Sequence, residues 1–375
     1  MKIAVNTRLL IKGKLEGIGW FTYETLKRIT QNHPEHQFYF IFDRPHHQDF
    51  IFGDHVTPLI AFPPAKHPYL WYLFFEWGVP YQLKKIKPDL FFSPDGWVPL
   101  TKKVKMVNVI HDLNFEHHPE FIAPTPLKYY QNYFHQFAQY PERIVTVSEF
   151  SKNDISNLYG VDKEKIDVVY NGSNTLYRPL TDDEKHQTRE KYSSGNPYFL
   201  FVGLVHKRKN LQRILEAFDR FKEQDQEQYK MVVVGELKYM DAETESSYER
   251  MKYKDDVYFL GRKPIDELIM ITGSASAMVY TSLFEGFGIP IVEAFQAETP
   301  LITSNITSMP EIAGDAALIV NPYEVEEIAD AMLKMSKEPE LVKQLIEKGK
   351  ERATLFSWDL TAERVWQSIE KVLYS

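Results

Sequence analysis

Two glutamates near the C-terminal end of the chain, Glu285 and Glu293, are separated by a glycine-rich turn and a proline. Proline is favoured at the first position of a helix, where its missing N–H group costs nothing, so Pro290 predicts that a helix begins there. We therefore expect Glu285 in the loop and Glu293 one turn into the helix. The glycines in the turn allow a ligand to approach the backbone closely.

The backbone N–H groups of Gly286, Phe287, Gly288 and Ile289 would then face whatever occupies the N-terminal end of this helix. Such a helix end attracts anions and polar oxygens. One carboxylate in the loop and one on the helix can each accept hydrogen bonds from a diol. A phosphate flanked by two sugars, which is a nucleotide sugar, suits this arrangement. The alternative is a surface loop that carries two solvated acids.

A second glycine, Gly203, follows an expected strand and precedes an expected helix, and Arg208 and Lys209 come shortly after it. Backbone groups at such a turn can approach a pyrophosphate, and Lys209 can neutralise its charge, with Arg208 as the second candidate. The alternative is a basic helix start on the surface. Asn210 is well placed to cap the helix that begins at Leu211.

The expected strand 104–110 runs directly into His111 and Asp112. In open α/β sheets, ligands bind beyond the carboxyl ends of the strands, so both side chains should face the cleft between the domains. A structural hydrogen bond would explain this His-Asp pair equally well.

Two further glycines, Gly17 and Gly19, follow the first expected strand and open a helix at Trp20. The full G-x-G-x-x-G pattern is missing, which argues against a plain NAD site.

Four residues in one short segment suggest metal binding at first sight: His111, Glu116, His117 and His118. Their spacing fits no compact zinc pattern, and adjacent histidines on a loop point apart. We therefore expect no metal site there.

The 375 residues favour two ordinary domains over one very large domain. With 43% hydrophobic and 26% charged residues, the composition is that of a soluble globular protein. A net charge of −8 does not favour a nucleic-acid partner, and the lack of cysteine excludes disulfides and thiolate metal sites. No apolar run reaches the length of a signal peptide or a membrane span. We therefore expect a cytoplasmic protein, with peripheral contact to the inner face of the membrane as a further expectation.

Short apolar runs alternate with helical patterns in both halves of the chain, and many of these runs are continuous, as in strands buried on both faces of a parallel sheet. The expected strands are 2–6, 37–42, 90–93, 104–110, 143–147 and 166–169 in the first half, and 198–202, 231–234, 257–260, 277–281, 301–303 and 317–320 in the second. The polar stretch 171–196 is the expected boundary. The pattern predicts two α/β domains of similar size.

The aromatic segment 69–77 would place apolar side chains on nearly every side of a helix. It is expected to be a helix buried against a sheet. The alternatives are a wall of a substrate pocket or a surface that dips into a lipid monolayer.

The motif around Glu285 and Glu293 closely resembles the signature of the family 4 glycosyltransferases, which are retaining enzymes with two Rossmann-like domains in the GT-B architecture. The Arg208-Lys209-Asn210 triplet also matches this family well. The resemblance implies that Glu285 lies beside the donor sugar, that Glu293 binds the nucleotide ribose and that Lys209 contacts the diphosphate.

In the first half of the chain the resemblance is thinner. It implies that His111 lies close to the transferred sugar and that the Gly17–Gly19 loop approaches the diphosphate from the opposite side. Asp95, at the end of another expected strand, is a candidate acceptor contact. In the second half of the chain, Leu204 departs from the family pattern. Many family members carry a basic or polar residue directly after the glycine that corresponds to Gly203. That leaves more of the charge neutralisation to Lys209 and Arg208.

The resemblance therefore implies an acceptor-binding domain at residues 1–175, a donor-binding domain at 176–356 and a C-terminal helix, 357–375, that crosses back to the first domain. The implied activity is retaining transfer of a hexose from a UDP-, GDP- or ADP-sugar to a hydroxyl of a glycan or lipid-linked glycan, without cofactor or metal. His111, Glu285 and Lys209 are the implied catalytic residues. A sugar-nucleotide 2-epimerase of the same fold and a non-catalytic sugar-nucleotide-binding protein are the alternatives.

Overall fold

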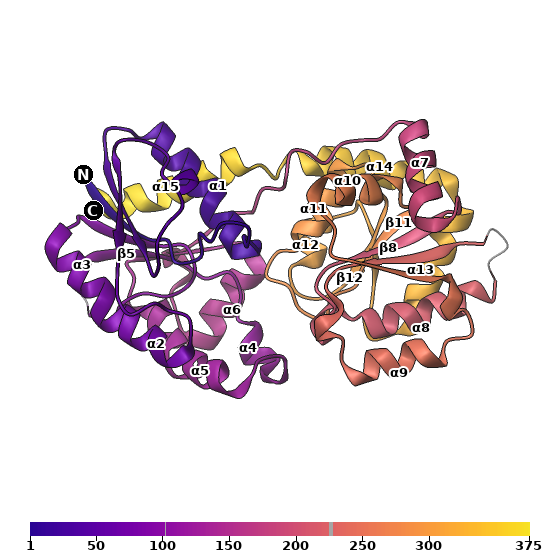
Figure 1. The fold of residues 1–375 in the computed structure, drawn as a ribbon, viewed down its shortest axis with the longest axis horizontal. Coiled ribbons are helices and arrows are strands. Elements are labelled where there is room, and N and C mark those ends of the chain that lie inside the picture. The colour runs from indigo at the N-terminus through magenta and orange to yellow at the C-terminus, as the bar shows by residue number, and fades with distance from the viewer. Residues whose placement is uncertain (102, 225–227) are drawn as a thin grey trace. The chain divides into compact units, whose positions relative to one another are not determined.

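The computed structural model describes residues 1–101, 103–224 and 228–375, which form two compact α/β units (Figure 1). Unit 1 comprises Met1–Gly172 together with Ser357–Ser375, and unit 2 comprises Ser173–Phe356. The chain thus enters unit 2 three residues before the expected boundary at residue 175 and leaves it at residue 356.

Unit 1 is built on a parallel sheet of seven strands in the order β3-β2-β1-β4-β5-β6-β7. Its strands are β1 (Lys2–Asn6), β2 (Gln37–Phe42), β3 (Val56–Ile60), β4 (Leu90–Ser93), β5 (Lys105–Val109), β6 (Arg143–Thr146) and β7 (Ile166–Val168). The sequence predicted six of them within a residue at each end and missed β3. That strand contains Pro58 and lies at the edge of the sheet, where proline is tolerated although it weakens the strand signal.

The helices of unit 1 cover this sheet. They are α1 (Gly17–Asn32), α2 (Pro68–Leu73), α3 (Val79–Ile86), α4 (Asn114–His117), α5 (Pro124–Gln139), α6 (Glu149–Tyr159) and α15 (Trp358–Leu373). A π-helical turn, Phe74–Gly78, joins α2 to α3, and short 3₁₀ turns lie at Gln48–Phe50, Pro119–Phe121 and Lys163–Lys165. Helix α1 begins at Gly17, so the expected start at Trp20 was three residues late.

The aromatic segment 69–77 divides between core and surface. Phe74 and Phe75 are fully buried in the core of unit 1, as expected for a helix packed on a sheet. Tyr69 and Trp77 are 74% and 69% exposed, so the expectation of a wholly buried helix was wrong for them.

Helix α15 belongs to unit 1 because it packs on α1, β5 and β6. Gly172 is required where the chain passes this helix, since a Cβ atom there would lie 2.3 Å from the backbone nitrogen of Trp358. The polar stretch expected at the boundary, residues 171–196, contains a helix in its second part. Thr181 and Glu184 form a capping box at the start of α7 (Asp182–Ser193).

Unit 2 contains a parallel sheet of six strands in the order β10-β9-β8-β11-β12-β13. Its strands are β8 (Tyr198–Val202), β9 (Lys230–Val234), β10 (Val257–Gly261), β11 (Ala277–Tyr280), β12 (Leu301–Ser304) and β13 (Leu318–Val320). Its further helices are α8 (Leu211–Lys222), α9 (Ala242–Arg250), α10 (Ile265–Ser274), α11 (Ile289–Gln296), α12 (Met309–Ala313), α13 (Val325–Lys337) and α14 (Pro339–Ala353), with 3₁₀ turns at Lys207–Lys209, Leu237–Tyr239 and Lys254–Asp256.

Each sheet has a point at which the strand order reverses direction. In unit 1 this point lies between β1 and β4, and in unit 2 it lies between β8 and β11. The loops after two such neighbouring strands diverge to opposite faces of the sheet and leave a crevice at the carboxyl edge, where α/β folds bind ligands. These two edges are therefore the places to look for a site.

Candidate active site

In unit 2, the loops that follow β8 and β11 are held together at the carboxyl edge of the sheet. Gly203 directly follows β8 with a φ of +148°, a conformation that favours glycine. The carbonyl oxygen of Arg208 accepts a hydrogen bond from the backbone N–H of Leu283 at 2.8 Å, and the Arg208 guanidinium donates to the carbonyl of Phe284 at 2.7 Å. The two sequence motifs thus form one site.

Asn210 supports this arrangement in a way that the sequence did not predict. It occupies the N-cap position of α8, but its φ is +61° and its side chain caps no helical N–H group. Its amide instead donates to the carbonyls of Thr281 and Pro322, at 3.0 and 2.8 Å. The residue therefore joins the start of α8 to the loops after β11 and β13.

Glu285 is buried, 8% exposed, and forms ion pairs with both predicted cations. Its carboxylate oxygens lie 2.5 Å from Lys209 Nζ and 2.8 Å from Arg208 Nη1. Burial alone would raise the pKa of Glu285, but the two cations outweigh it and lower the pKa to about 2. Glu285 is thus ionised at neutral pH and cannot serve as a proton donor there.

Lys209 has a second partner that the sequence analysis missed. Its ammonium donates to the hydroxyl of Tyr280 at 2.8 Å and lies 4.9 Å from the centre of that ring. Tyr280 is the last residue of β11 and is fully buried. Because a rigid strand holds this tyrosine, the Lys209 ammonium is fixed between Tyr280 and Glu285.

The glycine-rich turn leads into α11 as predicted, with one small difference. Gly288 precedes the helix with a φ of +96°, and the helix begins at Ile289, so Pro290 is its second residue rather than its first. The buried hydroxyl of Ser308 donates to the carbonyls of Glu285 and Phe287, at 2.9 and 3.1 Å. This serine fixes the turn from the start of α12.

Glu293 lies one turn into α11, as predicted, and remains partly exposed. Desolvation of its carboxyl raises the pKa of Glu293 to about 7, although a hydrogen bond with Tyr177 acts in the opposite direction. The charge on Glu293 is therefore sensitive to pH in the neutral range. Tyr177, which is buried, is a second tyrosine that the sequence analysis missed.

In unit 1, His111 follows β5 at the carboxyl edge, as expected. Its Nε2 lies 2.9 Å from the carbonyl oxygen of Pro94 and must carry a proton, because a carbonyl only accepts. Burial lowers the pKa of His111, so the ring is neutral at pH 7 and its Nδ1 offers a lone pair. The ring is held edge-on by Phe21, at a centroid distance of 4.9 Å.

Asp95 lies in a buried polar network at the same edge. Its carboxylate is 2.6 Å from Arg8 Nε and accepts a hydrogen bond from the Asn6 side chain at 2.7 Å. The Arg8 guanidinium in turn lies 4.5 Å from the centre of the Trp97 ring. Asp95, which is 5% exposed, is thus engaged in holding β1 against β4.

Gly17 and Gly19 differ in their surroundings. A Cβ atom at Gly19 would lie 3.3 Å from both the Leu15 side chain and the Leu9 carbonyl, so the helix packs closely against the preceding loop there. Gly17 has open space around it. A side chain at position 19 would therefore press on the preceding loop, whereas a side chain at position 17 would have room.

The histidines near His111 do not converge. His117 Nε2 lies 2.8 Å from Asp154, and His118 Nδ1 lies 3.0 Å from Glu120. Within the described ranges, the group that does bring metal-binding atoms together is His33, Glu35 and His36, within 4.8 Å of one another. That group precedes β2 and lies at the amino edge of the sheet, away from the edge that carries the site.

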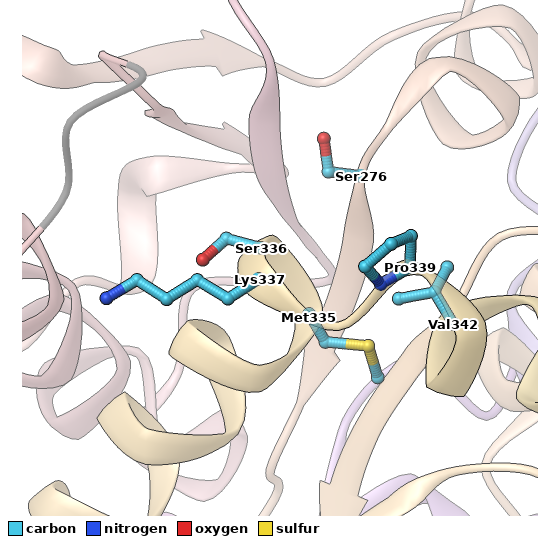
Figure 2. A pocket seen from close by; sticks show the side chains of 6 residues that line it. All are labelled: Ser276, Met335, Ser336, Lys337, Pro339 and Val342. Carbon is cyan, nitrogen blue, oxygen red and sulfur yellow. The ribbon is translucent and has the colours of Figure 1, made fainter.

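A pocket of about 610 Å³ in unit 2 is not part of this site. It lies where α13 meets α14, beside Ser276, which precedes β11 and so marks the amino edge of the sheet. Figure 2 shows the Lys337 side chain extending away from Pro339 and Val342, and the lining contains no acid or aromatic side chain among the residues that the structure describes.

Among the described residues, no helix is both long and apolar enough to span a membrane.

Two family models match the chain and together cover most of it. "Glycosyltransferase Family 4" matches residues 15–175, and "Glycosyl transferases group 1" matches residues 182–352. O-antigen chain mannosyltransferase B of Escherichia coli is 27% identical over 278 residues, 74% of this chain and 73% of that protein. O-antigen chain mannosyltransferase RfbU of Salmonella typhimurium is 28% identical over 278 residues, 73% of each chain.

Solved structures share the fold at low sequence identity. HepE from Anabaena, solved in complex with UDP and glucose, superposes with a TM-score of 0.76 at 16% identity. The superposition covers 99% of this chain and 100% of the HepE chain. The two parallel-sheet units, the site at the carboxyl edge and the family matches agree with one another. The chain belongs to the family 4 glycosyltransferases and has the GT-B fold.

Proposed function

We propose that this glycosyltransferase moves a hexose from a nucleoside diphosphate sugar to a hydroxyl of a glycan or lipid-linked glycan, with retention of the anomeric configuration. The supporting observation is the cluster of Glu285, Arg208 and Lys209 at the strand-order reversal of unit 2. Two cations face one carboxylate, beside the N-terminal end of α11. The cluster therefore carries a positive charge suited to an anionic leaving group.

In this proposal the diphosphate of the donor binds Lys209 and Arg208. As the bond between the sugar and the phosphate breaks, negative charge grows on the phosphate oxygen. Cations that Glu285 and Tyr280 already hold in place stabilise that charge without reorganising during the reaction. Glu285 stays ionised, contacts the sugar and positions it, rather than acting as an acid.

Glu293 would accept hydrogen bonds from the ribose hydroxyls. Its position one turn into α11 separates it from Glu285 along the chain, so the two carboxylates contact different sugars of the donor. Binding a diol favours the ionised carboxylate, which is the form that burial disfavours in the unliganded protein. Donor binding would therefore draw a proton off Glu293.

We assign the acceptor to unit 1 and a role in turnover to His111. The Nε2–H group of His111 donates a hydrogen bond to the carbonyl of Pro94, so the lone pair on Nδ1 can accept a hydrogen bond from a sugar hydroxyl. For retention, we propose front-face attack: the acceptor oxygen forms its bond to the anomeric carbon on the face that the diphosphate leaves. The acceptor's proton passes to the leaving phosphate, so no covalent sugar–enzyme intermediate is formed.

We further propose that the transferred hexose is mannose and that the product is a cell-surface polysaccharide, because both relatives described above are named O-antigen chain mannosyltransferases. The reaction would need no metal ion, since Lys209, Arg208 and the start of α11 supply the charge that a divalent ion would otherwise bring. Activity that persists in EDTA would support this, and a complete loss that metal restores would contradict it.

A thermal-shift screen with UDP, GDP, ADP and their sugars tests the donor class, because a ligand that binds the native state raises the melting temperature. NMR of the product made from the stabilising donor then gives the anomeric configuration. An α-linked donor that yields a β-linked product would exclude retention. Conversion of the donor without an acceptor would indicate an epimerase, and binding without any turnover would indicate a non-catalytic protein.

A further inference from the structure

Three side chains at the amino edge of the unit 1 sheet converge on one point. His33, Glu35 and His36 lie in the loop between α1 and β2. The backbone N–H of His36 donates to the carbonyl of His33 at 3.2 Å, which closes a tight turn with Pro34 as its second residue. Proline is favoured at this position, and such a turn brings its first and fourth residues close together. The local sequence therefore builds the group.

The polar atoms of this group have nearly the spacing that a zinc ion requires. Glu35 Oε1 lies 3.4 Å from His33 Nδ1 and 3.2 Å from His36 Nε2, and one such atom from each residue lies within 4.8 Å of the others. Ligand atoms about 2.0–2.1 Å from a tetrahedral zinc ion lie about 3.3 Å from one another. The directly paired His118 and Glu120 lie closer, at 3.0 Å. Two of the three separations thus match a zinc site.

The two imidazole rings are held in place by their neighbours. Trp366 on α15 stacks on the His33 ring at a centroid distance of 3.9 Å and lies 5.2 Å from the His36 ring. His36 is 5% exposed, and its Nδ1 lies 3.2 Å from the Met1 amine, so Nε2 is the nitrogen that faces Glu35. A neutral amine can accept the Nδ1–H of a ring that ligates through Nε2. Such a partner for the second ring nitrogen fixes the orientation of a ligating histidine.

We propose that His33, Glu35 and His36 bind a divalent transition-metal ion, with zinc as the ion that this ligand set suits and water as the fourth ligand. Imidazole nitrogen and carboxylate oxygen are ordinary zinc ligands, whereas magnesium and calcium prefer oxygen alone. The Glu35 side chain is 60% exposed, so an ion and a water molecule can reach the group. Glu370, on α15, adds a further negative charge near His36.

The ion acts as a clamp on the fold of unit 1. The turn that carries the ligands joins α1 to β2, and Trp366 on α15 packs on both histidine rings. Helices α1 and α15 also pack on each other (Figure 1). An ion that fixes the two rings therefore stabilises the docking of the last helix on unit 1. This clamp takes no part in sugar transfer, so the proposal does not depend on the proposed function.

Calorimetry with zinc chloride tests the proposal on the full chain after a chelator has removed bound metal. One zinc ion per chain should bind saturably, and zinc should raise the melting temperature because it binds the native state. Magnesium chloride should do neither. Glu35→Gln and His33→Phe should each weaken zinc binding by at least about tenfold, since even the loss of a residue that only supports a ligand has an effect of this size. His33→Phe keeps an aromatic ring to stack on Trp366.

The matched control is His118→Phe. The His118 ring also stacks on an aromatic ring, that of Phe121 at 4.7 Å, pairs with Glu120, and is 22% exposed against 26% for His33. This variant should bind zinc like the unchanged protein, and circular dichroism should show that every variant is folded. The proposal would be overturned by a lack of saturable zinc binding, by equal binding in His33→Phe and His118→Phe, or by a zinc-induced rise in melting temperature that persists in Glu35→Gln.

Discussion

Lys209 Nζ lies 2.5 Å from the Glu285 carboxylate, so the cation expected to hold the donor diphosphate is paired, in the unliganded protein, with the acid expected to hold the donor sugar. Arg208 shares the same carboxylate at 2.8 Å. The site is thus assembled before any donor arrives. An incoming diphosphate must share both cations with Glu285. Removing the charge of Glu285 should therefore favour binding of the diphosphate but lower the rate of sugar transfer.

Glu285→Gln should keep or tighten the binding of a nucleoside diphosphate while lowering turnover. The substitution releases two cations to the phosphates but removes a charge beside the reacting sugar, and loss of one such preorganised group costs about a hundredfold or more in rate. Calorimetry with the diphosphate and an assay of sugar transfer measure the two effects separately. Glu324→Gln, at an exposed acid of the same unit, is the matched control. Weakened diphosphate binding together with unchanged turnover would remove Glu285 from the site.

Lys209→Ala should weaken binding of a nucleoside diphosphate by about ten- to a hundredfold, as expected for hydrogen bonds to charged groups. Arg208→Ala should have a smaller effect, because that side chain is more exposed than Lys209 and is also bonded to the Phe284 carbonyl.

The control for both variants is the ligand itself. Binding of the nucleoside monophosphate should change less, because it lacks the terminal phosphate. Equal losses for the two ligands, measured by calorimetry, would place these cations elsewhere.

Tyr280→Phe should weaken diphosphate binding by about three- to tenfold, the value of one hydrogen bond, without unfolding unit 2. The ring that fills the core is kept, and only the hydroxyl that holds the Lys209 ammonium is lost. The double variant Tyr280→Phe/Lys209→Ala should then bind no worse than Lys209→Ala alone. Additive losses in this double-mutant cycle would show that Tyr280 acts independently of Lys209.

The sequence could predict the fold, and which residues the structure brings together in the candidate site of unit 2, because their signals are local. Buried parallel strands are continuous apolar runs, and the turn before α11 needs glycines at defined positions. Residues such as Glu285 and Lys209 lie within these motifs. Strand β3 was not predicted, because Pro58 weakens its sequence signal and its stability comes from pairing with β2.

The residues that were missed act through long-range contacts. Tyr280 is a buried aromatic residue at the end of an apolar strand, and its sequence context matches any core residue. Its partner Lys209 is 71 positions away in the chain. The sequence predicted that Asn210 caps a helix, which is a common role for asparagine. In the structure its side-chain amide instead donates hydrogen bonds to the carbonyls of Thr281 and Pro322. Such roles follow from which loops the strand order brings together, and the local sequence does not encode that order.

His111→Ala should lower turnover by roughly tenfold or more while leaving nucleotide affinity nearly unchanged, since it removes one acceptor of a sugar hydroxyl and no contact with the nucleotide. His111→Asn provides a rescue test, because the asparagine side-chain oxygen can take the place of Nδ1. Partial recovery of turnover in that variant would support a role in contacting substrate. Full turnover in His111→Ala would show that the histidine only supports the loop through Pro94.

Glu293 should make both donor binding and stability depend on pH, in ways that Glu293→Gln removes. At pH values below the Glu293 pKa of about 7, the carboxyl carries a proton, and a ribose that binds the ionised carboxylate must first displace that proton. Nucleotide affinity should therefore rise by about tenfold between pH 6 and pH 8 and then level off. Glu293→Gln should bind more weakly at pH 8 and show a much flatter profile. A similarly steep profile in this variant would mean that another group titrates.

The same pKa shift predicts that Glu293 destabilises the unliganded fold at high pH. The folded state holds this proton up to a pH of about 7, whereas the unfolded chain releases it near the ordinary value of 4.5. Stability is therefore lost as the pH rises between those two values, by about 3 kcal/mol at most. Glu293→Gln should consequently melt at a higher temperature than the unchanged protein at pH 8 and at nearly the same temperature at pH 5. Thermal unfolding without nucleotide at both pH values measures this difference, and a variant that is less stable at pH 8 would show that the ionised carboxylate is held by favourable contacts.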